Sequence, residues 1–279
     1  MAAWLARDGK HEVILCSRRP LAELSVETPK ETFVVRPQVF TDPADVPPVD
    51  WVLVATKTYD AAASAKWFPR LCSPGAAVAV LQNGVEHVER FAPYVPVERI
   101  VPVLIYCPAE RTSPTHLRQR AGAKLIAPDD VRGREFAALF AGTGVTAATT
   151  LDWKSEAWAK LCLNAAGVLN ALLLQPAAIF HEEPMAEVAR DIMRECLAVG
   201  RAEGAVLDDA VMEEVLQRFR SNPRDSVHSL HADQLAGRPT EIEARNGVVI
   251  RLGEKHGIRT PCNRMAVTLL KKLARAAAE

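Results

Sequence analysis

Asp50-Trp51-Val52-Leu53-Val54-Ala55-Thr56 is an apolar run that polar residues close at its carboxyl end. Ala76 to Leu81 (AAVAVL) repeats the pattern after a Pro74-Gly75 turn, and His11 to Ser17 (HEVILCS) precedes both runs. These runs are continuous rather than alternating, and a helical pattern over Ala61 to Leu71 separates two of them. Strands of this kind joined by helices predict an α/β fold with a parallel sheet that is covered on both faces.

The composition narrows the class of protein. The chain has 279 residues, 49% hydrophobic and 24% charged, with 34 basic and 34 acidic side chains. Nucleic acid is not expected as a partner, because its binding needs a basic footprint that the sequence lacks. Six cysteines without metal-ligand spacing and an amino terminus without a signal peptide predict a cytoplasmic protein. Polar residues interrupt the longest apolar stretch, Ala157 to Phe180, so no membrane span is expected.

The pattern changes near residue 150, where we place a domain boundary. One further strand is predicted over Arg99 to Ile105, and residues 111–150 read as shorter, more exposed β elements. From Asp152 onward the pattern is almost entirely helical. The predicted organisation is therefore an α/β domain over residues 1–150 followed by an all-helical domain over residues 151–279.

Polar residues follow the predicted strands where each strand ends. Arg18 follows the first visible strand, Lys57 the second and Asn83 the third. In an open α/β sheet, ligands bind outside the carboxyl ends of the strands, so these positions are candidate binding residues. The alternative is that they are ordinary turn residues, which often follow strands.

Lys160 and Asn164 interrupt an apolar helical run from Ala157 to Leu169. Residues four apart lie on one helix face, so an ammonium and a carboxamide would project together from an apolar surface. Burial would lower the pKa of the lysine toward neutrality and suit it to proton donation. The alternative is a half-exposed helix whose lysine reaches water.

A second polar segment begins at Ser229 and continues from Thr240-Glu241-Ile242 to Asn246-Gly247. With Thr240 as the residue before the first helical turn, Glu243 stands where a capping box needs an acidic residue. Glu241 in that first turn would also be favourable for the helix dipole alone.

The sequence resembles the ketopantoate reductases (2-dehydropantoate 2-reductases) in the order and spacing of its polar motifs. These motifs are Lys57, Gln82-Asn83-Gly84, Lys160-x-x-x-Asn164 and the segment from Ser229 to Gly247. The resemblance implies a Rossmann-like doubly wound domain, an all-helical second domain and an active site between them. It also implies the NADPH-dependent reduction of 2-dehydropantoate, or of a similar 2-oxo acid, as in pantothenate biosynthesis.

The resemblance also implies residue roles. Lys160 would be the general acid that protonates the ketone oxygen. Asn164, Ser229 and Asn83 would hold the carboxylate and carbonyl of the substrate, and Glu241 would anchor its distal hydroxyl. Lys57, Asn83 and Arg18 would contact the cofactor. An arginine at position 18 can fork onto a 2′-phosphate, which favours NADP over NAD.

Two departures from the family pattern leave alternatives open. The family's G-x-G-x-x-G loop precedes its first helix, whereas this sequence begins within that helix, so we expect the first strand and loop to be missing. We interpret this as a start codon assigned too far downstream; the alternative is a catalytically impaired remnant that binds a small acid or a partner subunit. The family commonly has another asparagine where this chain has Val168, so a related oxidoreductase with a different 2-oxo acid is a further alternative.

Apart from the substrate and the cofactor, the partner we consider is a second copy of the chain in a homodimer. His228 and His231 lie three residues apart, but no third ligand accompanies them, so no metal site is expected.

Overall fold

The computed structural model describes residues 1–276 and divides them into two compact units. The first unit holds residues 1–82 and 87–153, and the second holds residues 83–86 and the chain from residue 154 onward. The sequence prediction of one division near residue 150 did not assign residues 83–86 to the second unit. In the described part of the chain, no helix is long and apolar enough to cross a membrane.

Parallel pairing organises the centre of the first unit. β5 (Val49–Val54), β6 (Cys72–Val80) and β7 (Ile100–Pro102) form a parallel sheet in the order β5-β6-β7. Residues 76–80 of β6 are fully buried. The continuous apolar pattern arises because this strand is covered on both faces.

Three further sheets complete the first unit. β1 (Ile14–Cys16) pairs in parallel with β4 (Gln38–Phe40). β11 (Ala123–Pro128) lies between the parallel β12 (Val145–Thr150) and the antiparallel β8 (Leu104–Tyr106). A mixed sheet in the order β3-β2-β10-β9 consists of β2 (Leu24–Glu27), β3 (Thr32–Val35), β9 (Ala109–Arg111) and β10 (His116–Gln119).

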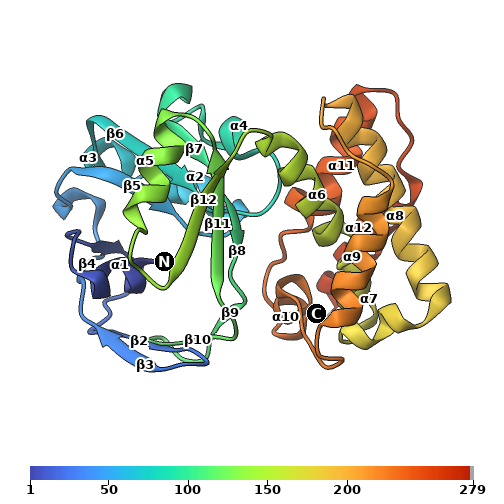
Figure 1. The fold of residues 1–279 in the computed structure, drawn as a ribbon, viewed down its shortest axis with the longest axis horizontal. Helices are drawn as coiled ribbons and strands as arrows, with labels where there is room; N and C mark the ends of the chain where they lie inside the picture. The colour runs from blue at the N-terminus through green and yellow to red at the C-terminus, as the bar shows by residue number, and fades with distance from the viewer. Residues whose placement is uncertain (277–279) are drawn as a thin grey trace. The chain divides into compact units, whose positions relative to one another are not determined.

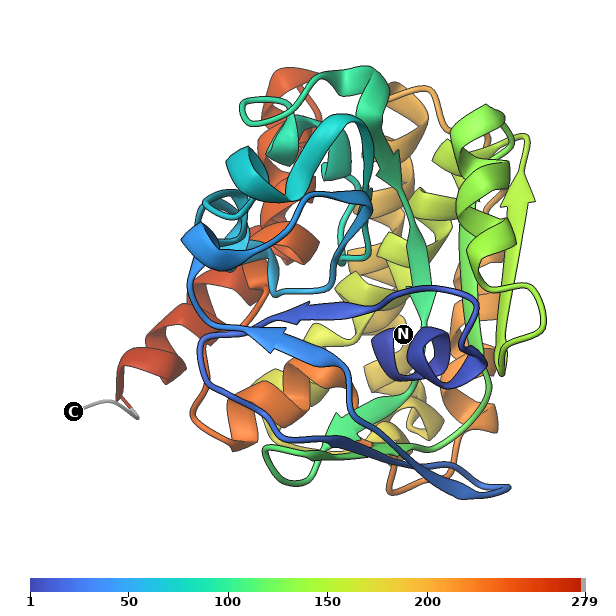
Figure 2. The same ribbon diagram turned by 90° about the vertical axis from the view of Figure 1, so that its left-hand side faces the viewer.

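Short helices connect these strands. They are α1 (Ala2–Asp8), α2 (Ala61–Ala65), α3 (Phe68–Leu71), α4 (His87–Phe91) and α5 (Val131–Leu139), with single turns η1 (Pro43–Asp45), η2 (Thr58–Asp60) and η3 (Val97–Arg99). Figure 2 shows α5, in light green, beside β12, and the two elements are in contact.

Proline and a missed helix cap account for three differences from the sequence prediction. The predicted helix over 61–71 is split into α2 and α3, because a continuous helix would press the Pro69 ring against the carbonyl of Ala65. The predicted strand over 99–105 is split into β7 and β8, since Pro102 has no N–H to extend a ladder. The predicted β region 111–150 contains α5, which Asp130 caps by accepting a hydrogen bond from Gly133 N at 2.7 Å.

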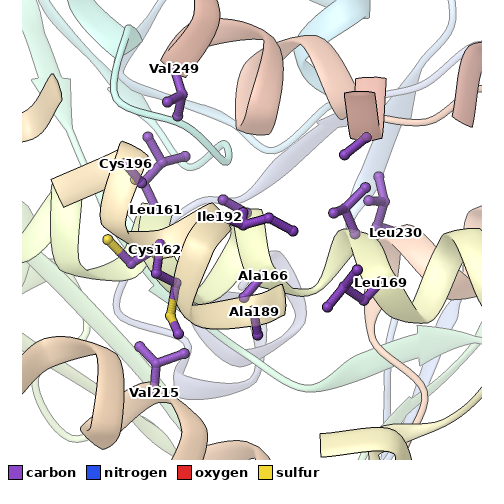
Figure 3. Packing of buried hydrophobic residues seen from close by; sticks show 14 of the residues in the cluster. Leu161, Cys162, Ala166, Leu169, Ala189, Ile192, Cys196, Val215, Leu230 and Val249 are labelled. Atoms are coloured by element: carbon purple, nitrogen blue, oxygen red, sulfur yellow. The ribbon is translucent and has the colours of Figure 1, made fainter. Parts of the chain in front are cut away.

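The second unit is helical, as predicted (Figure 1). It comprises α6 (Trp153–Ala166), α7 (Val168–Leu173), η4 (Ala177–His181), α8 (Glu183–Ala202), α9 (Ala210–Ser221), α10 (Ser229–Leu235), the π-helical η5 (Glu243–Gly247), α11 (Val248–Lys255) and α12 (Pro261–Ala276). Figure 3 shows how side chains such as Leu161, Ile192 and Val249 fill the space between these helices. The predicted fold class, a Rossmann-like parallel α/β domain followed by a helical domain, is confirmed.

A buried polar network joins four elements of the second unit. The Glu195 carboxylate of α8 accepts hydrogen bonds from the backbone N–H groups of Cys262 (2.8 Å) and Asn263 (2.9 Å) in the first turn of α12. The Asn263 side chain donates to Glu195 (2.7 Å) and accepts from Asn246 Nδ2 (2.9 Å), which also donates to Ala165 O in α6 (3.1 Å). Glu195 therefore satisfies helix-end donors that would otherwise lack partners.

Removal of the Glu195 carboxylate tests this network. Glu195→Ala leaves the two backbone N–H groups without their acceptor and removes one of the two acceptors of Asn263 Nδ2, so we expect the free energy of unfolding to fall by about 2–4 kcal/mol. Glu187→Ala in the same helix removes only exposed ion pairs and should cost less than about 1 kcal/mol. Urea unfolding monitored by circular dichroism compares the two, and equal losses would contradict a capping role for Glu195.

Candidate active site

Lys160 is a buried cation in the middle of α6. The residue is 8% exposed, although lysine is rarely buried to this degree without a partner. Asn164 lies one helical turn later and is half-buried, and its carboxamide forms no hydrogen bond within the described chain. The run that contains both residues does not continue unbroken to Leu169, since α6 ends at Ala166 and Val168 is buried at the start of α7.

Asn83 connects Lys160 to Glu241. Lys160 Nζ donates to Asn83 Oδ1 at 3.4 Å, and Asn83 Nδ2 donates to Glu241 Oε2 at 3.0 Å. Glu241 is 4% exposed, so both charged groups lie in a largely desolvated site. An ammonium, an amide and a carboxylate thus form one short chain of polar contacts, in which each hydrogen bond polarises the next.

Gly84 permits this arrangement because its backbone lies against residue Ala244. Its φ is +97°, and a Cβ atom built there would lie 2.7 Å from Ala244 O. Only glycine combines a positive φ with so close an approach. The glycine of the Gln82-Asn83-Gly84 motif therefore brings Asn83 to Glu241.

The segment after Glu241 corrects one sequence prediction. The capping box of Thr240 and Glu243 does not form, because residues 243–247 adopt a π-helix and no side-chain cap precedes it. The Glu243 carboxylate instead pairs with Arg251 (3.5 Å) and with Lys271. Single π-helical turns of this kind are frequent at functional sites.

Arg245 is a site residue that the sequence interpretation missed. It lies in the π-helix, is 3% exposed, and donates from Nη2 to Ser229 Oγ, the first residue of α10, at 2.8 Å. The signal was available in the sequence, since Arg245 follows Glu241 by four residues and would lie about one turn away on a helix.

The pKa of Lys160 is lowered to about 7. Burial is the largest cause, and the positive charges of Arg245 and Arg218 lower it further, while Glu241 acts in the opposite direction. The balance between desolvation and a nearby carboxylate could not be derived from the sequence. A lysine with this pKa can release and regain a proton near neutral pH.

The two histidines of the same region are not arranged as a metal site. Burial, followed by the charges of Arg245, His231 and Arg218, lowers the pKa of His228 to about 4, so this ring is neutral at pH 7. Within the described residues, no group of three or more histidine, cysteine or acidic side chains could hold a metal ion.

The candidate cofactor residues lie in the first unit. Arg18 is exposed and follows β1, and Lys57 is half-buried and follows β5. Buried Gln82 orders the loop at Lys57, because its Nε2 donates to Thr56 O (3.0 Å) and lies 3.3 Å from Lys57 O. Arg90 in turn fixes the Gln82 amide by donating to its Oε1 at 3.1 Å.

Models of one protein family match both units. The model described as ketopantoate reductase PanE/ApbA matches residues 1–129, and that of the ketopantoate reductase PanE/ApbA C terminal matches residues 152–274. A 2-dehydropantoate 2-reductase of Caulobacter vibrioides is 48% identical over 274 residues, which are 98% of this chain and 94% of that protein. The Mycobacterium tuberculosis enzyme of the same name is 38% identical over 97% of this chain and 92% of its own length.

Solved structures agree with these sequence matches. A PanE/ApbA family ketopantoate reductase from Ralstonia eutropha superposes with a TM-score of 0.90 at 32% identity, covering 99% of this chain and 94% of its own. A 2-dehydropantoate 2-reductase from Geobacter metallireducens also gives a TM-score of 0.90, at 28% identity, covering 96% of this chain and 94% of its own. The chain therefore belongs to the ketopantoate reductase family.

Proposed function

We propose that this protein catalyses the NADPH-dependent reduction of 2-dehydropantoate, a small branched 2-oxo acid, to pantoate, as in pantothenate biosynthesis. The observation that carries the proposal is the buried Lys160 ammonium, in contact with Asn83 and close to Glu241. Family membership over nearly the whole chain supports the same reaction.

Lys160 is the general acid of the proposed mechanism. When bound, NADPH supplies a hydride to the carbonyl carbon of the substrate. The carbonyl oxygen then becomes an alkoxide and takes a proton from Lys160 Nζ, which regains one from solvent. Because this oxygen gains negative charge only as the reaction proceeds, an ammonium beside it stabilises the transition state more than the ground state.

The remaining polar groups bind and orient the substrate. Asn164, Asn83 and Ser229 are proposed to hold the polar end of the 2-oxo acid. Glu241 would accept a hydrogen bond from the distal hydroxyl. The half-buried Asn164 carboxamide, which forms no hydrogen bond in the described chain, supports its assignment to the substrate.

Arg18 and Lys57 fit the cofactor. The exposed guanidinium of Arg18 follows a parallel strand, the place where an adenosine 2′-phosphate is recognised in this class of fold. Arginine binds phosphate through paired hydrogen bonds, and Lys57, which follows β5, adds a second positive charge.

The proposed setting is the reducing cytoplasm. All six cysteines are free thiols, and Cys16 is exposed, as is usual where disulfides do not form. A homodimer is the proposed assembly, which light scattering measures directly.

Loss of the Lys160 ammonium tests the general acid. In Lys160→Ala we expect kcat for NADPH oxidation with 2-dehydropantoate to fall by ~10²–10⁴. Lys154→Ala removes an exposed lysine of the same helix that contacts Glu203 O, and its activity should stay within about twofold of wild type. Full activity of Lys160→Ala would exclude this lysine as the proton donor.

The pH dependence follows from the pKa of about 7 at Lys160. Only the ammonium form donates a proton, and its fraction falls as pH rises through this pKa. The value of kcat/KM should therefore fall about tenfold per pH unit above neutrality. Steady-state rates between pH 5.5 and about 9.5 measure this limb, and a flat profile would contradict the assignment.

Discrimination between NADPH and NADH tests Arg18. In Arg18→Ala we expect KM for NADPH to rise by about 10–100-fold while KM for NADH changes little, because only NADPH carries the 2′-phosphate. Arg134→Ala, which removes a surface pair with Asp129, is the matched control and should change neither value. An equal rise in KM for NADPH and for NADH would show that Arg18 does not bind the 2′-phosphate.

A further inference from the structure

Arg245 is a buried cation whose hydrogen bonds are incomplete. Its Nη2 donates to Ser229 Oγ at 2.8 Å, but its Nε is buried and has no acceptor within the described residues. A guanidinium removed from water is costly unless other groups replace its hydration. Burial indeed lowers the pKa of Arg245, which shows that the site disfavours its charge.

The two carboxylates whose charges favour the Arg245 cation hydrogen-bond to other side chains. Glu241 accepts a hydrogen bond from Asn83 Nδ2 (3.0 Å), and Asp233 pairs with Arg238 Nε (3.0 Å). The Nε donor of Arg245 is thus available to an acceptor, and guanidinium groups bind carboxylates through donors of this kind.

The position of Arg245 connects it to the proposed reaction. Arg245 follows Glu241 by four residues, and Asn83 connects Glu241 to Lys160 through hydrogen bonds of 3.0 and 3.4 Å. The charge of Arg245 lowers the pKa of Lys160 in this arrangement. Ser229, its hydrogen-bond partner, is exposed, so a ligand can reach this end of the buried guanidinium.

We propose that Arg245, together with Ser229, binds the C1 carboxylate of the 2-oxo acid substrate. The proposal rests on the function proposed above and assigns the main carboxylate-binding role to a cation. In a 2-oxo acid the carboxylate adjoins the reacting carbonyl. A carboxylate held by Arg245 therefore directs the C2 oxygen toward the neighbouring ammonium of Lys160.

This assignment also explains how the site tolerates Val168. Val168 is fully buried among apolar side chains and supplies no hydrogen bond to a substrate. A guanidinium that binds a carboxylate through two charged hydrogen bonds more than compensates for one amide contact.

Binding of the carboxylate would also change the charge around Lys160. The charged groups that act on Lys160 are Arg245, Arg218 and Glu241. A bound carboxylate neutralises the field of Arg245, so the pKa of Lys160 rises and the lysine takes up a proton. Substrate binding thereby favours the protonated form of Lys160, which is the form that donates the proton.

Two ligands that differ in charge at C1 test the proposal. We would measure the binding of 3-methyl-2-oxobutanoate and of its methyl ester by calorimetry in the presence of NADP⁺. In Arg245→Gln the acid should bind ~100-fold more weakly, while the ester changes by less than about threefold. Arg245→Lys keeps the charge but loses the fork, and should weaken acid binding by about tenfold.

Arg264→Gln is the matched control, because the Arg264 side chain forms an exposed ion pair with Glu254 in α11, and this variant should bind both ligands as wild type does. Melting curves establish that each variant folds, and if Arg245→Gln does not fold, Arg245→Lys carries the test. Equal losses for acid and ester would overturn the proposal, since they indicate a structural role, and so would unchanged binding of the acid.

A pH profile supplies a second readout. Without the Arg245 charge the pKa of Lys160 is higher, so the alkaline limb of kcat/KM should move to higher pH in Arg245→Gln. An unmoved limb would contradict the link to Lys160. If wild type binds the acid through Arg245 but reduces no 2-oxo acid, the proposed function is wrong and the carboxylate site is still supported. If wild type is active but Arg245→Gln binds the acid as well as wild type does, the carboxylate site is wrong and the proposed function is still supported.

Discussion

The charge of one buried lysine is the constraint on which the candidate site depends. Lys160 lies in the middle of a helix whose other buried residues are apolar, and desolvation alone would favour its neutral form. Glu241 offsets part of that penalty, and Asn83 provides the contact between them. Arg245 acts against the ammonium, so the site holds its proton donor near the point where both protonation states are populated.

Rigid supports keep these groups in place. Gly84 sets the distance between the Asn83 loop and the π-helix, and Asn246 in that π-helix donates to the end of α6. Glu195 and Asn263 continue the same network to α8 and α12. The elements that carry Lys160, Arg245 and Glu241 are thus joined by buried polar bonds, which specify geometry more sharply than apolar packing does.

Much of the fold could be predicted from the sequence, because continuous apolar strands and long amphipathic helices depend on local pattern. One failure occurs where local and distant interactions compete. Glu243 was predicted to cap its own helix, but Arg251 and Lys271 provide it with cationic partners. The Pro69 and Pro102 interruptions follow from local stereochemistry and could have been predicted.

The candidate site was predicted unevenly for a similar reason. Resemblance to a family identified Lys160, Asn83 and Glu241, and the structure brings these three together. Arg245 belonged to no motif, and its four-residue spacing from Glu241 was a signal that pattern alone could not weigh, because the importance of Arg245 depends on its burial. The direction of the Lys160 pKa shift likewise depends on the sum of several opposing charges.

The assignment of residues 83–86 to the second unit has a consequence for how such proteins can be divided and recombined. A gene cut once near residue 150 would leave Asn83 on one fragment and its partners Lys160 and Glu241 on the other. The helical fragment would then keep both charged groups but lose the amide that links them. Chimeras between relatives must therefore exchange the Asn83 loop together with the helical unit, so that this short segment and the distant helices are inherited as one module.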